Sequence, residues 1–151
     1  MTISEHYTAQ VGKWVSFLRD ADEKRLVTLR NALSVRRLQW VEENRETLAS
    51  IPGDSLERAY RLILCKIGIE EHEAPVAFRD ETKLVFHSKN SCPTLTACMA
   101  LGLDTCRICR IVLEQPTDLL VKRVDENLSF SRNYNVMRPE SPYCEEIISF
   151  I

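Results

Sequence analysis

Five of the six cysteines lie in the carboxy-terminal half of the chain, at Cys92, Cys98, Cys106, Cys109 and Cys144. Cysteine thiolates bind soft metals, attack electrophiles and form disulfides, which ordinary surface residues do not do. Which of these reactions takes place would decide what kind of protein this is. The sequence narrows the choice among these reactions but does not decide it.

A metal site is the first hypothesis. Cys106 and Cys109 are three residues apart, so on a helix they share one face. Such a pair can bind zinc, hold part of an iron–sulfur cluster or cycle as a dithiol. Cys92 and Cys98 are too far apart to form a second pair of this kind. The hypothesis therefore takes Cys92, Cys106, Cys109 and Cys144 as ligands of zinc or an iron–sulfur cluster. The alternative is that the thiols have no shared chemical role.

A reactive thiol is the second hypothesis. Cys92 directly precedes Pro93, which is typical of the first position of a helix. A thiol at a helix amino terminus faces unpaired N–H groups and the positive end of the helix dipole, which favours the thiolate. Cys92 is therefore the candidate nucleophile, and His87, at the end of a predicted strand, is the candidate base. For His87 the alternative is a histidine at a sheet edge that binds the backbone.

A third pattern concerns anions. Arg132, Asn133 and Tyr134 follow one another at the end of an alternating segment. Arginine with asparagine and tyrosine can bind a carboxylate or phosphate through two parallel hydrogen bonds. These three residues form the candidate ligand-binding group, and ordinary surface charge is the alternative.

The first part of the chain, residues 1–70, is predicted to be helical. Apolar residues recur there every three or four positions, and residues 21–50 contain no glycine or proline. The apolar stripe slips near Ser34 and Val35, so we expect a bend or a break at that point.

A separate helix is expected to begin after Asp54, with Glu57 completing a capping box, and to end at Gly68. Cys65 belongs to this helix. Cys65 and Cys98 each lie among apolar helical residues, so we expect both to be buried and unreactive.

The second part, residues 71–151, changes to the alternating period of strands after Gly68. Short helices separate these strands and carry the cysteine cluster, and Pro116 is expected to begin the last helix. The sequence thus predicts a single α+β domain, residues 1–151, whose amino-terminal helical layer packs on a small antiparallel sheet. The predicted strands are Val76–Arg79, Lys83–Ser88, Leu128–Tyr134 and Cys144–Ile151.

Composition limits the partners. With 44% apolar and 28% charged residues, the chain is typical of a soluble folded domain. A net charge of −2 gives no basis for nucleic-acid binding. No apolar run approaches the roughly 20 residues that span a bilayer, and no signal peptide is visible, so we expect a cytoplasmic protein with reduced cysteines and no membrane association. The expected partner is a small molecule, and a homo-oligomer is left open.

The carboxy-terminal half resembles a family of small bacterial proteins named for L-2-amino-thiazoline-4-carboxylic acid hydrolase, and more distantly vinyl-reductase-type ligand-binding domains. The resemblance covers residues 75–151. It implies an α+β domain that encloses a small organic ligand in a pocket lined or braced by cysteines, and the family name implies hydrolysis of a cyclic carbon–nitrogen bond. The residues that carry it are Ser91-Cys92-Pro93, Gly102, Cys109, Leu128 to Tyr134 with Arg132, and Cys144.

Two functions from different classes follow. The first is a domain that binds a small ligand or a metal in a cysteine-lined site. The alternative is a cysteine-dependent hydrolase acting on a small substrate that contains a carbon–nitrogen bond; whether the protein is an enzyme is left open. In both cases we expect the candidate residues to converge at one end of the sheet, namely Cys92, the Cys106–Cys109 turn, Cys144, His87 and Arg132.

Overall fold

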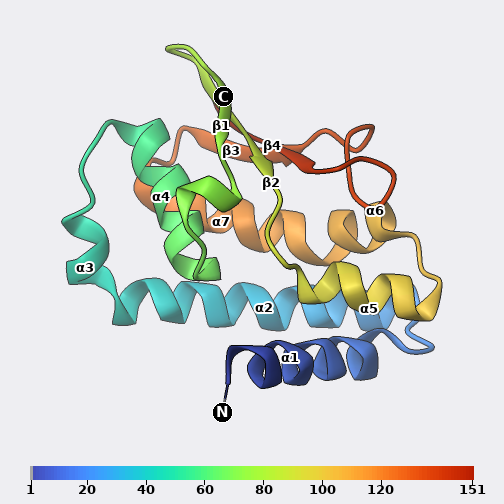
Figure 1. Cartoon of the computed structure of the whole chain (residues 1–151). Coiled ribbons are helices and arrows are strands. Elements are labelled where there is room, and N and C mark those ends of the chain that lie inside the picture. The colour runs from blue at the N-terminus through green and yellow to red at the C-terminus, as the bar shows by residue number, and fades with distance from the viewer. Residues whose placement is uncertain (1) are drawn as a thin grey trace.

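The computed structural model describes residues 2–151 and shows helices layered against one small sheet (Figure 1). A 3-10 turn, η1 (Glu71–Glu73), precedes the first strand, and a π-helical turn, η2 (Cys109–Leu113), joins two helices. The other elements are α1 (Ile3–Leu18), α2 (Glu23–Glu43), α3 (Arg45–Ala49), α4 (Ser55–Ile67), β1 (Val76–Arg79), β2 (Lys83–Ser88), α5 (Pro93–Leu101), α6 (Thr105–Ile108), α7 (Glu114–Val124), β3 (Leu128–Arg132) and β4 (Cys144–Phe150).

The sheet confirms the predicted α+β class. Within residues 2–151 its four strands are all antiparallel, in the order β1-β2-β4-β3. Side chains alternate between its two faces because successive residues of a strand point in opposite directions. The face toward the helices carries a mostly apolar set: Leu84, Phe86 and Ser88 of β2, Leu128, Phe130 and Arg132 of β3, and Cys144, Glu146 and Ile148 of β4.

Two apolar cores hold the layers together. The first lies between the sheet and the helices α4 and α7, with Phe86 and Ile148 among its fully buried members. The second joins α1, α2, α5 and α6, with Leu18, Leu26 and Cys98 at its centre. Helix α2 runs the length of the molecule between α1 and α7 (Figure 1). The helical layer predicted for the amino-terminal part is therefore present, and the later helices extend it.

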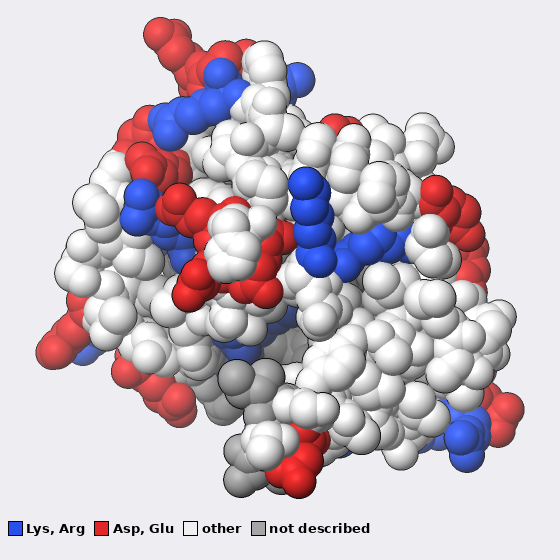
Figure 2. Space-filling model, in the orientation of Figure 1, with Lys and Arg blue, Asp and Glu red and all other residues white. Residues whose placement is uncertain are grey.

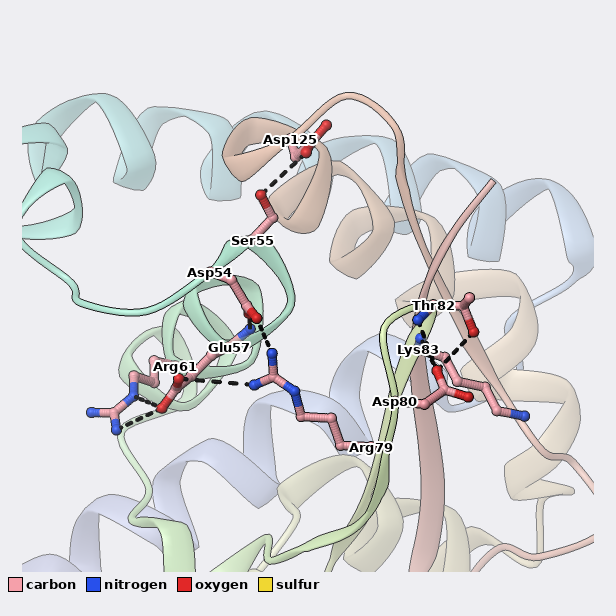
Figure 3. Close-up of polar contacts among 9 residues, drawn as sticks. All are labelled: Asp54, Ser55, Glu57, Arg61, Arg79, Asp80, Thr82, Lys83 and Asp125. Carbon is pink, nitrogen blue, oxygen red and sulfur yellow. Dashed lines mark hydrogen bonds and ion pairs between the residues drawn. The ribbon is translucent and has the colours of Figure 1, made fainter.

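Helix α4 begins and ends at the residues that the sequence predicts. Asp54 accepts a hydrogen bond from the Glu57 N–H at 3.0 Å, and Gly68 ends the helix with a left-handed φ of 80°. The capping box is only half formed, because the Glu57 carboxylate binds Arg61 at 3.0 Å and does not return to Asp54. Figure 3 shows that Arg79 of β1 reaches Asp54 and Glu57, so this cap also anchors the β1–β2 hairpin to α4.

The prediction of a bend or a break near Ser34 and Val35 is wrong. Helix α2 continues through both residues and ends at Asn44, whose side chain donates to the Trp40 carbonyl at 2.8 Å. Ser34 instead donates its hydroxyl to the Arg30 carbonyl inside the helix. The apolar stripe shifts because Leu26, Leu29 and Leu33 pack into the cluster that contains the π turn, whereas Trp40 and Val41 pack against α4 and α7.

The prediction that a helix starts at Pro116 is also wrong. Pro116 lies within α7, and the chain is helical without interruption from Thr105 to Val124. Proline has no N–H to donate and its ring crowds the carbonyl four residues before it. The π turn lies directly ahead of it, with the Glu114 N–H donating to the Cys109 carbonyl five residues back. The wider turn accommodates Pro116 without ending the helix, and such turns are frequent at functional sites.

Cys65 is exposed, which corrects the expectation that it is buried. It lies four residues after Arg61 and seven after Arg58, so it shares their face of α4 rather than the buried stripe. Cys98, in contrast, is fully buried as expected.

The surface carries both signs of charge. Figure 2 shows acidic and basic side chains mixed over the face that it displays, with a broad uncharged area at its lower right. Among residues 2–151, no helix combines the length and the apolar character that crossing a bilayer requires.

We predict that Gly68→Ala lowers the free energy of unfolding by about 1 kcal/mol, because an L-residue is strained at the positive φ of this cap. Gly12→Ala is the matched control. It lies inside α1, where alanine is favoured over glycine by up to about 1 kcal/mol. An added Cβ meets nothing within 4 Å at either position, so packing does not enter the comparison. Urea unfolding of both variants measures the difference, and equal shifts would contradict this account of the cap.

Candidate functional site

The candidate site centres on a buried ion pair between the ends of two strands. Arg132 of β3 donates Nε–H to Glu146 Oε1 at 3.0 Å, and only 10% and 8% of the two side chains are exposed. The Ser88 hydroxyl, at the end of β2, donates to the other oxygen of Glu146. Burial by itself would lower the pKa of Arg132, but the Glu146 carboxylate raises it above its ordinary value. Arg132 is therefore a permanent cation in the protein interior.

One N–H donor group of Arg132 has no hydrogen-bond partner within residues 2–151. Arg132 Nη1 is buried and has no hydrogen-bond partner among the described residues, and the same holds for the Tyr134 hydroxyl. Unpaired buried donors are rare and cost free energy, so each of them requires an explanation. We call Arg132, Glu146, Ser88 and Tyr134 the Arg132 site.

A second guanidinium approaches the Arg132 site from α2. Arg37 donates Nη1–H to the Thr117 hydroxyl at 2.6 Å. Burial and, to a smaller extent, the positive charge of Arg132 lower the pKa of Arg37 to about 10, while Glu146 opposes both effects. Arg37 still carries its charge at neutral pH. The buried part of the site thus holds two guanidinium groups and one carboxylate.

Tyr134 closes the site toward the surface. Arg110 of the π turn stacks on its ring, with 4.3 Å between the guanidinium carbon and the ring centroid. Burial raises the pKa of Tyr134 to about 12, against the opposing effect of Arg132 and with a further increase from Glu114. Arg132 and Glu114 both lie close to the Tyr134 hydroxyl. Neither of them meets it with hydrogen-bond geometry. The phenol therefore stays protonated and can donate.

Sulfur atoms lie beside the Arg132 site. Cys109, Met137 and Cys144 form one buried cluster, against which Cys106 and Tyr134 pack. Cys109 comes from the π turn, Cys144 from the start of β4 and Met137 from the loop between β3 and β4. The structure therefore brings together three of the four cysteines proposed as metal ligands. It places them beside the Arg132 site, since the charge of Arg132 acts on the Cys109 thiol.

Burial holds three of the cysteine thiols on the helical side in their protonated form. Burial raises the pKa of Cys109 to about 12 and that of Cys98 to about 11, and it also raises the pKa of Cys106. Metal ligation requires thiolates. Among residues 2–151, no three His, Cys, Asp or Glu side chains are grouped so that they could hold a metal ion.

Cys92 and His87 lie on different sides of the sheet. Cys92 is the N-cap of α5, and its sulfur is close enough to Cys98 and Cys109 to influence them, which places it on the helical side. His87 points to the opposite face, because its neighbours Phe86 and Ser88 face the helices. Among the described residues, no hydrogen bond joins the two side chains.

His87 belongs to a separate polar group on the outer face. Its Nε2 lies 3.1 Å from Glu145 Oε1, and its ring stacks on Tyr143 with 3.8 Å between centroids. Asn133 donates to the other oxygen of Glu145 at 2.8 Å. Asn133, one residue past the end of β3, therefore binds the outer-face Glu145 and is separated from Arg132 and Tyr134, with which it was grouped as a ligand-binding residue.

Sequence reasoning missed two members of the Arg132 site, Ser88 and Glu146, and two residues next to it, Arg37 and Thr117. Ser88 and Glu146 had a readable signal, since each is a polar residue at an inward position of an alternating strand. Arg37 had one too, because it follows Leu33 by four residues along the apolar stripe of α2. Thr117 had none, because its position depends on the π turn before it.

In the comparisons with known proteins, no family model, curated protein or solved structure matches this chain. The resemblance to the L-2-amino-thiazoline-4-carboxylic acid hydrolase family accordingly stays a prediction.

We predict that Glu146→Gln lowers the free energy of unfolding by about 3–5 kcal/mol, because it leaves the buried Arg132 charge without a counter-charge. Glu42→Gln is the matched control: it breaks the exposed pair with Arg123, whose closest atoms are 3.8 Å apart, and should cost about 0–1 kcal/mol. Denaturant unfolding measures both values. Equal losses would show that the Arg132–Glu146 pair is effectively solvated.

We also predict a loss of stability at alkaline pH. The pKa of Cys109 rises from 9.0 to about 12 on folding, so its contribution is complete below pH 9 and falls as the pH rises toward about 12. Between about pH 8 and pH 11 this amounts to about 2–3 kcal/mol. Cys109→Ala should make the pH dependence shallower by that amount. Val112→Ala, a buried change in the same turn without a titrating group, should lower stability equally at both pH values.

Proposed function

We propose that this protein binds a small organic anion at the Arg132 site. The observation that carries the proposal is the pair of buried, unpartnered donors, Arg132 Nη1 and the Tyr134 hydroxyl. A carboxylate or phosphate oxygen accepts from both kinds of donor, and arginine is well suited to hold such groups. An anion at this position would satisfy two groups that are costly to leave unpaired.

The charges around the site support an anion over a neutral ligand. Arg37 and Arg132 face a single buried carboxylate, that of Glu146. At the rim, Arg110 and Glu114 contribute one charge of each sign next to Tyr134. The site therefore keeps one positive charge in excess, which a singly charged anion would balance.

The side chains next to the charged groups favour an anion that carries an organic body. Beside the charged groups lie the apolar and sulfur-bearing side chains of Cys109, Met137 and Cys144, with Leu113 packed against them. Such a surface favours contact with carbon and sulfur rather than with water. We therefore infer a carboxylate or phosphate joined to a small apolar group.

Metal binding and cysteine hydrolysis have weaker support. The thiols nearest the site are stabilised in the protonated form, which disfavours thiolate ligands. A hydrolase using Cys92 would need a base other than His87, because that imidazole binds Glu145 on the outer face of the sheet. The unpartnered donors, in contrast, are what an anion-binding site supplies.

We predict that at least one member of a panel of small carboxylates (benzoate, succinate) and inorganic phosphate raises the melting temperature of the protein. Tyr134→Phe should weaken that probe's affinity several-fold, since one hydrogen bond contributes about 0.5–1.5 kcal/mol. Without the probe, the same variant should be as stable as the parent or more stable by up to about 1 kcal/mol, because it removes an unpaired buried hydroxyl. Thermal shift titrations measure both effects.

Tyr143→Phe is the control for this test, because it removes a hydroxyl from the tyrosine that stacks on His87 at the outer face. It should leave the probe's affinity unchanged. The proposal fails if no probe stabilises the parent protein. It also fails if the two tyrosine variants lose affinity equally.

A further inference from the structure

Cys144 differs from the other cysteines in having a fixed cation against its sulfur. Arg138 donates Nε–H to Cys144 Sγ at 3.3 Å, and its Nη1–H binds the Asn90 carbonyl at 2.5 Å. The guanidinium is thus held from two sides. A neighbouring cation is the environment in which cysteines react with oxidants, because the thiolate is the reactive species.

A second thiol lies on the same side of the sheet. Cys106 packs against the buried cluster that contains Cys144, and its Sγ points toward the loop after β3, donating to the Tyr134 carbonyl at 3.6 Å. Cys106 stands in the first turn of α6 and is half-buried, whereas Cys109 in the same cluster is only 6% exposed. Cys144 itself is 8% exposed, so Cys106 is the most accessible thiol of this cluster.

We propose that Cys144 is a peroxide-sensitive thiol and that Cys106 resolves its oxidised form into an intramolecular disulfide. This inference does not depend on the proposed anion. It assigns a chemical use to the cysteine cluster that needs neither a metal nor a substrate, and the oxidant is hydrogen peroxide.

The two steps balance. Cys144 sulfur attacks one oxygen of hydrogen peroxide; the S–O bond forms, the O–O bond breaks, and hydroxide leaves and takes up the thiol proton as water. The product is a sulfenic acid. Cys106 sulfur then attacks the Cys144 sulfur; the S–S bond forms, the S–O bond breaks, and the departing hydroxide takes up the Cys106 proton. Two thiols and one peroxide give one disulfide and two waters.

The disulfide would alter the loop that closes the Arg132 site. The Cys106 contact with the Tyr134 carbonyl and the Arg138 contact with the Cys144 sulfur both hold this loop, and both need the present positions of the sulfurs. A disulfide also needs the two Cα atoms within roughly 7 Å of each other, so it would tie the first turn of α6 to the start of β4. We therefore expect oxidation to change the conformation of residues 133–143.

The test uses the full chain with Cys65→Ser, which removes the exposed thiol that would link two molecules. The reduced protein is treated with hydrogen peroxide, remaining thiols are alkylated, and peptides are mapped by mass spectrometry. The expected result is a Cys106–Cys144 crosslink within a monomer. Cys106→Ser should abolish the crosslink and leave a Cys144 sulfenic acid that dimedone traps, whereas the matched control Cys109→Ser should retain the crosslink.

Arg138→Gln should slow the loss of the Cys144 thiol by about tenfold, because the cation beside the sulfur is removed. The proposal is overturned if Cys106 and Cys144 stay reduced under peroxide, or if Cys144 links to Cys109 or Cys92 instead. If a variant fails to fold, mapping the Cys65→Ser protein alone still decides between these outcomes.

Discussion

The buried pair between Arg132 and Glu146 is the constraint on which the rest of the site depends. Removing two charges from water is costly, so a buried pair persists only where the remaining donors and acceptors are also matched. Ser88 supplies one such match to Glu146. Arg132 Nη1 lacks one among the described residues, although the site around it is otherwise closely packed. The fold therefore keeps a buried polar group unpaired at a cost in stability, which is how functional sites often differ from ordinary cores.

The π turn connects this site to the helical layer. Pro116 would interrupt a regular α-helix, and the wider turn before it lets the chain remain helical from Thr105 to Val124. One consequence is local: Cys109 and Arg110 begin the turn, and the first faces the sulfur cluster while the second covers Tyr134. The other is that Thr117, one residue after the proline, meets Arg37 of α2. A backbone irregularity thus sets the positions of groups on two layers.

Much of the fold was predictable because it depends on local signals. The change of period after Gly68 located all four strands, and Asp54 and Gly68 marked the ends of α4. The site was less predictable because it depends on which strand ends meet. Arg132 was found from its residue type, but its partner Glu146 is 14 residues away along the chain and depends on the β3–β4 register. The prediction that Cys65 is buried failed for a related reason. Apolar neighbours along the sequence do not determine which way a helical side chain points.

The register of β2 against β4 explains why two adjacent glutamates have different surroundings. Glu145 and Glu146 point to opposite faces, and each meets a different partner: His87 outside and Arg132 inside. A slip of one residue would move every side chain of the strand to the other face. It would turn Cys144, Glu146 and Ile148 outward and bring Glu145, Ile147 and Ser149 inward. The observed register pairs Ile148 with Leu84 and Phe130, and it pairs Glu146 with Arg132. The register therefore decides which glutamate the buried arginine reaches. Ile148 of the apolar core and Glu146 of the site lie two residues apart on the same face of β4, so packing and chemistry share one register.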